Sequence, residues 1–193
     1  IVHGHEPILS EMIAAASQDP GLLAEAEKVG AKGVNIAGTC CTANELLMRH
    51  GIPIAGNFLN QELVIATGAI ELMAVDVQCI MQGLSNIAGC FHTKLITTAD
   101  KAKMQGVEHI SMDEKTALTT AKKLVTMAIE NYKNRGRVHI PKHKNFAVGG
   151  FSFESINYML GGRFRSSFRP LNDNIINGRI RGIVGVVGCT NPK

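Results

Sequence analysis

The sequence predicts an α/β fold in which helices cover both faces of a mostly parallel β-sheet. Short apolar runs alternate along the chain with amphipathic stretches of helical period, which is typical of parallel strands joined by crossover helices. Of the 193 residues, 45% are hydrophobic and 19% are charged, as in one ordinary globular domain. These observations indicate a Rossmann-like, doubly wound sheet, and we expect residues 1–193 to form a single α/β domain.

Proline marks the beginning of the first two predicted helices. Residues 1–2 are interpreted as the end of a strand, after which Pro7 can occupy the first helical position. Apolar residues then recur at helical spacing. The Asp-Pro pair at residues 19–20 begins a second helix, which Gly30 ends.

A short strand and a capped helix are expected next. Residues 33–37 are apolar and are predicted to form the strand. Thr42 and Glu45 have the spacing of a capping box, which predicts a helix that Gly51 closes. Cys41 is therefore expected immediately before the N-cap of this helix.

The remaining apolar runs are interpreted as strands of the same sheet, at residues 52–55, 73–78, 94–98, 108–111, 146–148 and 182–187. Helices are predicted at residues 61–70, 113–134, 152–160 and 170–176. Another short helix is predicted after Cys79 and ends at about residue 88. The longest of them has one continuous apolar face. A basic connection from Arg135 to Lys144 is interpreted as a solvated loop.

Four potential metal ligands follow predicted strands, namely His5, Cys41, Cys79 and Cys189. The carboxyl ends of parallel strands meet at one edge of a sheet, where open α/β folds bind their ligands. Residues far apart in the sequence can therefore converge there, and the positive ends of the following helices favour thiolates. Three thiolates and one imidazole select soft metal centres, which include zinc, copper(I) and iron–sulfur clusters.

The remaining cysteines and histidines fit this pattern less well. Adjacent cysteines rarely supply two ligands to one metal, so we expect one of Cys40 and Cys41 to be a ligand. The same choice applies to His3 and His5. Cys90 does not follow a predicted strand and is interpreted as a packing residue. Surface or loop positions are expected for His50, His109, His139 and His143.

Composition excludes several classes of protein. The net charge of +4 is spread along the chain and aromatic residues make up only 5%, unlike nucleic-acid-binding domains. No run approaches the roughly 18 apolar residues of a membrane span, and the start lacks a signal-peptide pattern. We therefore expect a cytoplasmic protein without a transmembrane segment. Its five cysteines, an odd number, are expected to be reduced thiols or metal ligands.

Short segments throughout the chain carry a resemblance to a known family. They read VHGHEP at residues 2–7, GTCCT at 38–42, LMRHGIP at 47–53, DVQCIM at 76–81, RPLND at 169–173, GRIRG at 178–182 and VGCTN at 187–191. Together they resemble the nickel–iron carbon monoxide dehydrogenases over essentially the whole chain. Thr190 departs from this pattern, since Asn is expected after the cysteine in most members.

The resemblance implies a nickel–iron–sulfur cofactor, the C-cluster, in which one iron lies outside a cubane. By motif, His5 and Cys41 correspond to ligands of the outlying iron. Cys79 and Cys189 correspond to ligands of cubane irons. His3 and Cys40 are then neighbours of the cluster, and His5 acts as a ligand rather than as an acid or base. No other residue of the chain is assigned a catalytic role.

The implied reaction converts CO and water to CO2, two protons and two electrons, reversibly. The resemblance also implies a ferredoxin-like electron acceptor, further 4Fe-4S clusters N-terminal to this chain, a homodimer, and in some members an acetyl-CoA synthase subunit. Two more cluster cysteines, one of which binds nickel, and a catalytic lysine are implied beyond Lys193. Because the chain starts on Ile1 and ends soon after Cys189, we expect a central fragment of a multidomain protein. Since two implied ligands and the electron relay are missing from it, we expect the fragment alone to be inactive.

Two alternatives remain open from the sequence. One is a hybrid-cluster protein of the hydroxylamine-reducing type, which residues 3–7 and the Cys40–Cys41 pair fit less well. The other is a non-enzymatic module in which three cysteines and one histidine hold a single structural zinc ion. The metal content of the protein distinguishes these alternatives from the nickel–iron enzyme.

Overall fold

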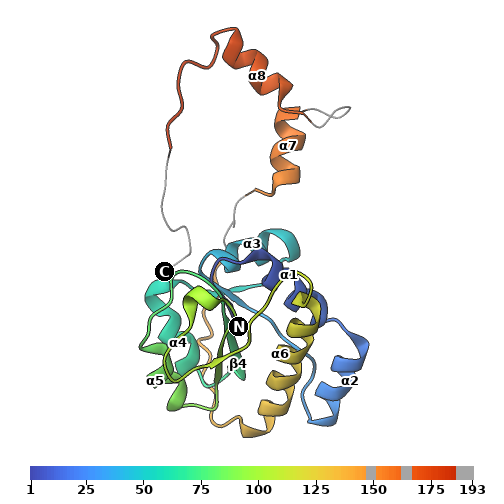
Figure 1. Ribbon diagram of the computed structural model, residues 1–193, viewed down its shortest axis with the longest axis vertical. Coiled ribbons are helices and arrows are strands. Elements are labelled where there is room, and N and C mark those ends of the chain that lie inside the picture. The colour runs from blue at the N-terminus through green and yellow to red at the C-terminus, as the bar shows by residue number, and fades with distance from the viewer. Residues whose placement is uncertain (147–150, 162–166, 186–193) are drawn as a thin grey trace.

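A computed structural model describes residues 1–146, 151–161 and 167–185 of the chain (Figure 1). The strands are β1 (Val2–His3), β2 (Gly38–Thr39), β3 (Ile54–Gly56), β4 (Leu72–Val75), β5 (Lys94–Thr97) and β6 (Glu108–His109). The helices are α1 (Pro7–Ala16), α2 (Pro20–Lys28), α3 (Cys40–His50), α4 (Gln61–Ala66), α5 (Leu84–Gly89), α6 (Ala117–Asn131), α7 (Phe153–Gly161) and α8 (Arg169–Ile176). Short 3-10 turns form at η1 (Phe58–Asn60), η2 (Asp100–Ala102) and η3 (Tyr132–Asn134).

The six described strands form one parallel sheet in the order β3-β2-β1-β4-β5-β6. Val2 pairs with Gly38 of β2 on one side and with Ala74 of β4 on the other. The strand order therefore reverses between β1 and β4, which is the topological switch point of a doubly wound sheet. The predicted fold class is confirmed.

Strand β4 shows why both faces of the sheet are covered by helices. Leu72 and Ala74 belong to a core that residues of α1, α2, α3 and α6 complete. Met73 and Val75, which point to the opposite face, belong to a second core with residues of α4 and α5. Figure 1 shows α4 and α5 on one side of the sheet, with α1, α2 and α6 on the other. A strand buried on both faces has to be apolar throughout.

Gly38 lets β2 run close against α3. A Cβ atom at this position would lie 2.4 Å from the Cα of Ala43, which is closer than real Cβ contacts come. Any larger residue at position 38 would have to push α3 away from the sheet edge. The close approach therefore sets the position of the first turn of α3.

Helices α7 and α8 pack against each other and project away from the sheet (Figure 1). Their contact includes an edge-to-face pair of Phe153 and Phe168, with ring centroids 6.5 Å apart. The expectation that residues 1–193 form one domain stays a prediction.

The strand predicted at residues 33–37 is wrong, because β2 begins at Gly38. The ladder is reached only at the end of this segment, where the Ala37 carbonyl accepts the Val2 N–H at 3.0 Å. Val34 and Ile36 nevertheless pack against the core. Burial of these side chains, without strand pairing, accounts for the apolar pattern.

The strand predicted at residues 182–187 is also not found in its described part. Residues 182–185 form no regular structure, and Ile183 and Val184 are each 88% exposed. Residues 186–187 lie outside the described residues, as do 147–148 of the strand predicted at 146–148. Phe146 itself is exposed and is not part of a strand.

Most helix predictions are correct in position but differ at their ends. Helix α6 begins at Ala117 rather than at residue 113, because Asp113 Oδ1 accepts the Thr116 N–H at 2.8 Å and stabilises a turn there. The helix predicted at residues 61–70 ends at Ala66 and is followed by Gly68 with a φ of 68°. In the described ranges, no helix is both long enough and apolar enough to cross a membrane.

Helix α6 allows a direct test of the main core. Leu124 is 1% exposed within that core, whereas Leu118 of the same helix is 47% exposed. We expect Leu124→Ala to lower the free energy of unfolding by about 2–5 kcal/mol, because it leaves a cavity. Leu118→Ala should change it by about 0.5 kcal/mol or less. Urea denaturation followed by circular dichroism measures both, and equal effects of the two substitutions would contradict this packing.

Candidate functional site

Three chain segments meet at the carboxyl edge of the neighbouring strands β2, β1 and β4. Residues 4–6 follow β1 and contain His5, residues 76–80 follow β4 and contain Cys79, and α3 follows β2 and contains Cys41. Because β1 lies between the other two strands, its loop is a neighbour of both. Cys189, the fourth predicted ligand, lies outside the described residues.

Helix α3 begins at Cys40, two residues before the predicted capping box. The Thr42 N–H donates to the carbonyl of Gly4, at 3.0 Å, so a contact with the β1 loop replaces the expected side-chain cap. The Thr42 hydroxyl is buried without a hydrogen-bond partner. Cys41 therefore lies in the first turn of α3 and not before an N-cap, although it keeps its place near the positive end of the helix.

His3 links the end of β2 to the loop after β4. Its ring is fully buried, and because a carbonyl can only accept, its Nε2–H donates to the Cys79 carbonyl at 2.7 Å. Nδ1 then accepts the hydroxyl of Thr39. Burial lowers the pKa of His3 and outweighs the hydrogen bond to Cys79, which acts in the opposite direction. The imidazole is thus neutral, and both of its nitrogens are engaged.

Asp76 links the loop after β4 back to the loop after β1. Its fully buried Oδ1 accepts the N–H groups of His5, at 2.6 Å, and of Val77. Burial raises the pKa of the Asp76 carboxyl and outweighs these N–H groups, which lower it. Oδ2 is buried without a partner. Sequence reasoning overlooked this residue, whose signal is an acidic side chain directly after a buried apolar strand.

Gly4 is the residue that lets the two loops come this close. Its φ is 134°, and a Cβ atom there would lie 1.8 Å from Asp76 Oδ1. Only glycine can adopt this backbone conformation and leave room for the carboxylate. The glycine between the two histidines of the VHGHEP segment is thus required by its contact with Asp76, in the loop after β4.

Strained backbone is concentrated at the same edge. In the described part of the chain, the non-glycine residues with positive φ are Cys40 at 61°, Gln78 at 65° and Cys79 at 52°. Each such conformation costs on the order of 1–3 kcal/mol and persists only where the surroundings hold it. Two of the three residues are cysteines of the candidate site, which is typical of a functional region.

The structure separates the two members of each candidate pair by burial. His3 and Cys40 are buried, whereas His5 is exposed and Cys41 is partly exposed. Cys79 is also exposed. The accessible donors are therefore those that the sequence analysis assigned as ligands, and thiolates from separate loops can each bind a different iron of a cluster. The donor set fits a sulfur-rich metal cluster.

No group of three or more His, Cys, Asp or Glu side chains within the described ranges lies close enough to hold a metal ion. The assignment of His5, Cys41, Cys79 and Cys189 as ligands stays a prediction.

The other cysteine and histidines lie away from these loops. Cys90 is exposed at the end of α5, where its thiol donates to the Asn86 carbonyl at 3.5 Å, so its interpretation as a packing residue is wrong. His50 pairs with Glu11 at 2.7 Å. The expected surface or loop positions are confirmed for His50, His139 and His143. The expectation is wrong for His109, which ends strand β6 and has a side chain that is only 18% exposed.

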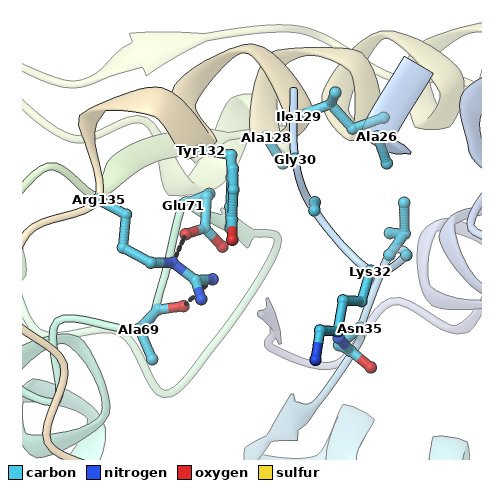
Figure 2. A pocket seen from close by; sticks show the side chains of 13 residues that line it. Ala26, Gly30, Lys32, Asn35, Ala69, Glu71, Ala128, Ile129, Tyr132 and Arg135 are labelled. Atoms are coloured by element: carbon cyan, nitrogen blue, oxygen red, sulfur yellow. Dashed lines mark hydrogen bonds and ion pairs between the residues drawn. The ribbon is translucent and has the colours of Figure 1, made fainter. Parts of the chain in front are cut away.

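A cavity of about 340 Å³ opens near the opposite, amino end of β4 (Figure 2). Glu71, directly before β4, accepts hydrogen bonds from Arg135 Nε at 2.6 Å and from His92 Nε2 at 3.2 Å. Burial raises the pKa of Glu71, but the bonds from Arg135 and His92 outweigh it and hold that pKa below its usual range. The Arg135 side chain thus ties the end of η3 to Glu71. Residues 135–144 are nevertheless exposed and form no helix or strand, so the solvated loop predicted there is confirmed.

Known proteins resemble this chain along its whole length. The carbon monoxide dehydrogenase 1 of Methanosarcina acetivorans is 54% identical over 100% of this chain and 30% of its own length. The beta subunit of the carbon monoxide dehydrogenase/acetyl-CoA synthase of Moorella thermoacetica is 46% identical over 100% of this chain and 29% of its own.

A nickel-free crystal structure of the carbon monoxide dehydrogenase from Thermococcus sp. AM4 superposes on this fold with a TM-score of 0.80. The two are 52% identical, and the match covers 97% of this chain and 29% of that one. This chain thus spans about 30% of the length of the curated relatives that it matches.

The family profile described as "Prismane/CO dehydrogenase family" matches residues 1–193. Taken with the parallel sheet and the cysteine-bearing segments at its carboxyl edge, this match shows that the chain belongs to the Prismane/CO dehydrogenase family.

Proposed function

We propose that this chain contributes part of the nickel–iron–sulfur site of an anaerobic carbon monoxide dehydrogenase. One observation carries the proposal. The three segments that bear His5, Cys41 and Cys79 are joined by hydrogen bonds at one edge of the sheet, through Thr42 to Gly4 and through His3 to Cys79. The relatives named carbon monoxide dehydrogenase support it, with identities up to 54% over the whole chain.

In this proposal, the accessible donors are ligands of the metal atoms of the cluster. The His5 imidazole and the Cys41 thiolate bind an outlying iron, and the thiolates of Cys79 and Cys189 bind irons of the cubane. When bound, the cluster supplies the metal atoms that activate CO and water and take up two electrons. His3 and Asp76 are not metal ligands in this proposal. Their side chains hold the two loops that carry His5 and Cys79.

The assembled protein that we propose oxidises CO with water to CO2 and passes two electrons to a ferredoxin-like acceptor. Further 4Fe-4S clusters outside residues 1–193 carry the electrons, and the protein acts as a cytoplasmic homodimer. The Moorella thermoacetica relative, named as a subunit of a carbon monoxide dehydrogenase/acetyl-CoA synthase, supports a possible acetyl-CoA synthase partner. The thiolate ligands are compatible with a reducing compartment.

Removal of one proposed ligand tests its role. In the intact protein, we expect Cys79→Ala to lower CO oxidation by at least about 100-fold, because even residues that only support a ligand contribute about 10- to 100-fold. Nickel content should fall in parallel. The matched control is Cys90→Ala, which changes another exposed cysteine, at the end of α5, and should leave both activity and nickel content unchanged. Full activity and full nickel in Cys79→Ala would contradict the proposal.

Metal analysis separates this proposal from a structural zinc module. The intact protein, purified without oxygen, should contain nickel, iron and acid-labile sulfide, because soft thiolates on separate loops suit a cluster. A structural zinc site would give zinc alone. Plasma emission spectrometry with a colorimetric sulfide assay measures all four, and zinc without sulfide would refute the cluster.

Residues 1–193 alone should not turn over CO. The resemblance implies two further cluster cysteines and an electron relay outside this segment, so the ligand set within it is partial. The test is a CO oxidation assay with an artificial electron acceptor, after anaerobic reconstitution of the 193-residue chain with iron, sulfide and nickel. The intact protein treated in the same way is the positive control, and measurable turnover by the chain would disprove this expectation.

A further inference from the structure

Two side chains cross between the loops at the switch point in opposite directions. His3 ends β1, and its Nε2–H reaches the Cys79 carbonyl in the loop after β4. Asp76 directly follows β4, and its Oδ1 accepts the N–H of His5 in the loop after β1. Each hydrogen bond thus joins a side chain at the end of one strand to the backbone of a proposed ligand in the loop after the other strand. We refer to His3 and Asp76 together as the clasp.

The surroundings make the clasp stiff. Both side chains are fully buried, so each depends on these hydrogen bonds in place of water. Gly4 packs against the Asp76 carboxylate with no room for a Cβ atom, and Thr39 fixes the His3 ring from the other side. A shift of either loop would therefore have to break a hydrogen bond to a buried side chain.

The clasp also supports a strained backbone. Gln78 and Cys79 both have positive φ, which a chain keeps only where other contacts hold it. The Cys79 carbonyl accepts a second, longer hydrogen bond from the buried Gln61 Nε2 at 3.4 Å, while Gln61 Oε1 accepts the Met81 N–H at 3.4 Å. Buried side chains thus hold the backbone of Cys79 and leave its thiol exposed.

We propose that His3 and Asp76 are paired positioning residues that set the separation between the His5 imidazole and the Cys79 thiol. The identity of the group held between them rests on the proposed function. The clasp itself is a property of the two loops. Positioning residues act through the ligands they orient, and their removal typically lowers metal affinity about 10- to 100-fold.

The chain offers a matched control at the same edge of the sheet. His109, at the end of β6, contacts the Thr97 hydroxyl through Nδ1 at 2.9 Å and Asp100 through Nε2 at 3.0 Å. The Thr97–His109 pair thus repeats the Thr39–His3 pair, but no proposed ligand takes part in it. Substitutions in this second pair test for general effects of losing a histidine or a threonine at the edge.

The first experiment measures the clasp without reference to the cluster. In the intact protein purified without added nickel, hydrogen–deuterium exchange is followed for peptides that contain His5 and Val77. We expect Asp76→Ala to speed exchange of these amides at least about tenfold, because they lose their buried acceptor. His109→Leu should leave them unchanged. Unchanged exchange in Asp76→Ala would overturn the clasp whatever the cofactor is.

The second experiment measures what the clasp does for the site. Nickel affinity and the electron paramagnetic resonance spectrum of the reduced cluster are compared among variants of the intact protein. His3→Leu and Asp76→Ala should each lower nickel affinity about 10- to 100-fold and alter the spectrum. His3→Gln, whose amide can still donate to the Cys79 carbonyl, should retain most of both. His109→Leu should match the wild type.

Thr39→Val provides a variant that keeps the shape of the core if His3→Leu does not fold. It removes the hydroxyl that orients the His3 ring, so it should lower nickel affinity in the same direction, whereas Thr97→Val should not. Wild-type affinity and spectrum in Asp76→Ala and Thr39→Val would overturn the positioning role. A wild-type protein without a nickel–iron–sulfur cluster would refute the proposed function, while the exchange experiment would still decide the clasp.

Discussion

The parallel pairing of β1 with both β2 and β4 is the constraint on which the candidate site depends. Val2 occupies the middle of this arrangement, paired with Gly38 on one side and with Ala74 on the other. Because all three strands run in the same direction, the segments that follow them leave the sheet at one edge. Chain segments more than 70 residues apart, such as those of His3 and Cys79, are thereby brought into hydrogen-bonding contact.

At that edge, polar burial and backbone strain occur together. Asp76 and His3 are fully buried although burial disfavours their charged forms. The positive φ of Cys40 and Cys79 adds a further cost. The apolar cores on both faces of the sheet supply the stability that such a region lacks. Buried polar side chains and positive φ angles that gather in one region of an otherwise regular chain are typical of functional sites.

Sequence reasoning succeeded where burial alone decides structure, and it failed where hydrogen bonds between distant segments decide it. The apolar pattern around β4 and along α6 predicts these elements because their side chains fill the two cores. The capping box at Thr42 was wrong, since the Thr42 N–H bonds to Gly4 of another loop. The strand predicted at residues 33–37 was wrong because Val34 and Ile36 pack against a core without joining the ladder.

The sequence by itself determined the doubly wound parallel fold and the placement of His5 and Cys79 after strands, because periodicity and turn residues are local signals. It also showed the family resemblance, since that depends on motifs in the chain. Only the tertiary structure decided which member of each pair is buried, why Gly4 must be glycine, and that Asp76 and His3 cross between the loops. These features depend on which strands become neighbours in the sheet, and local patterns of residues do not determine the order of the strands.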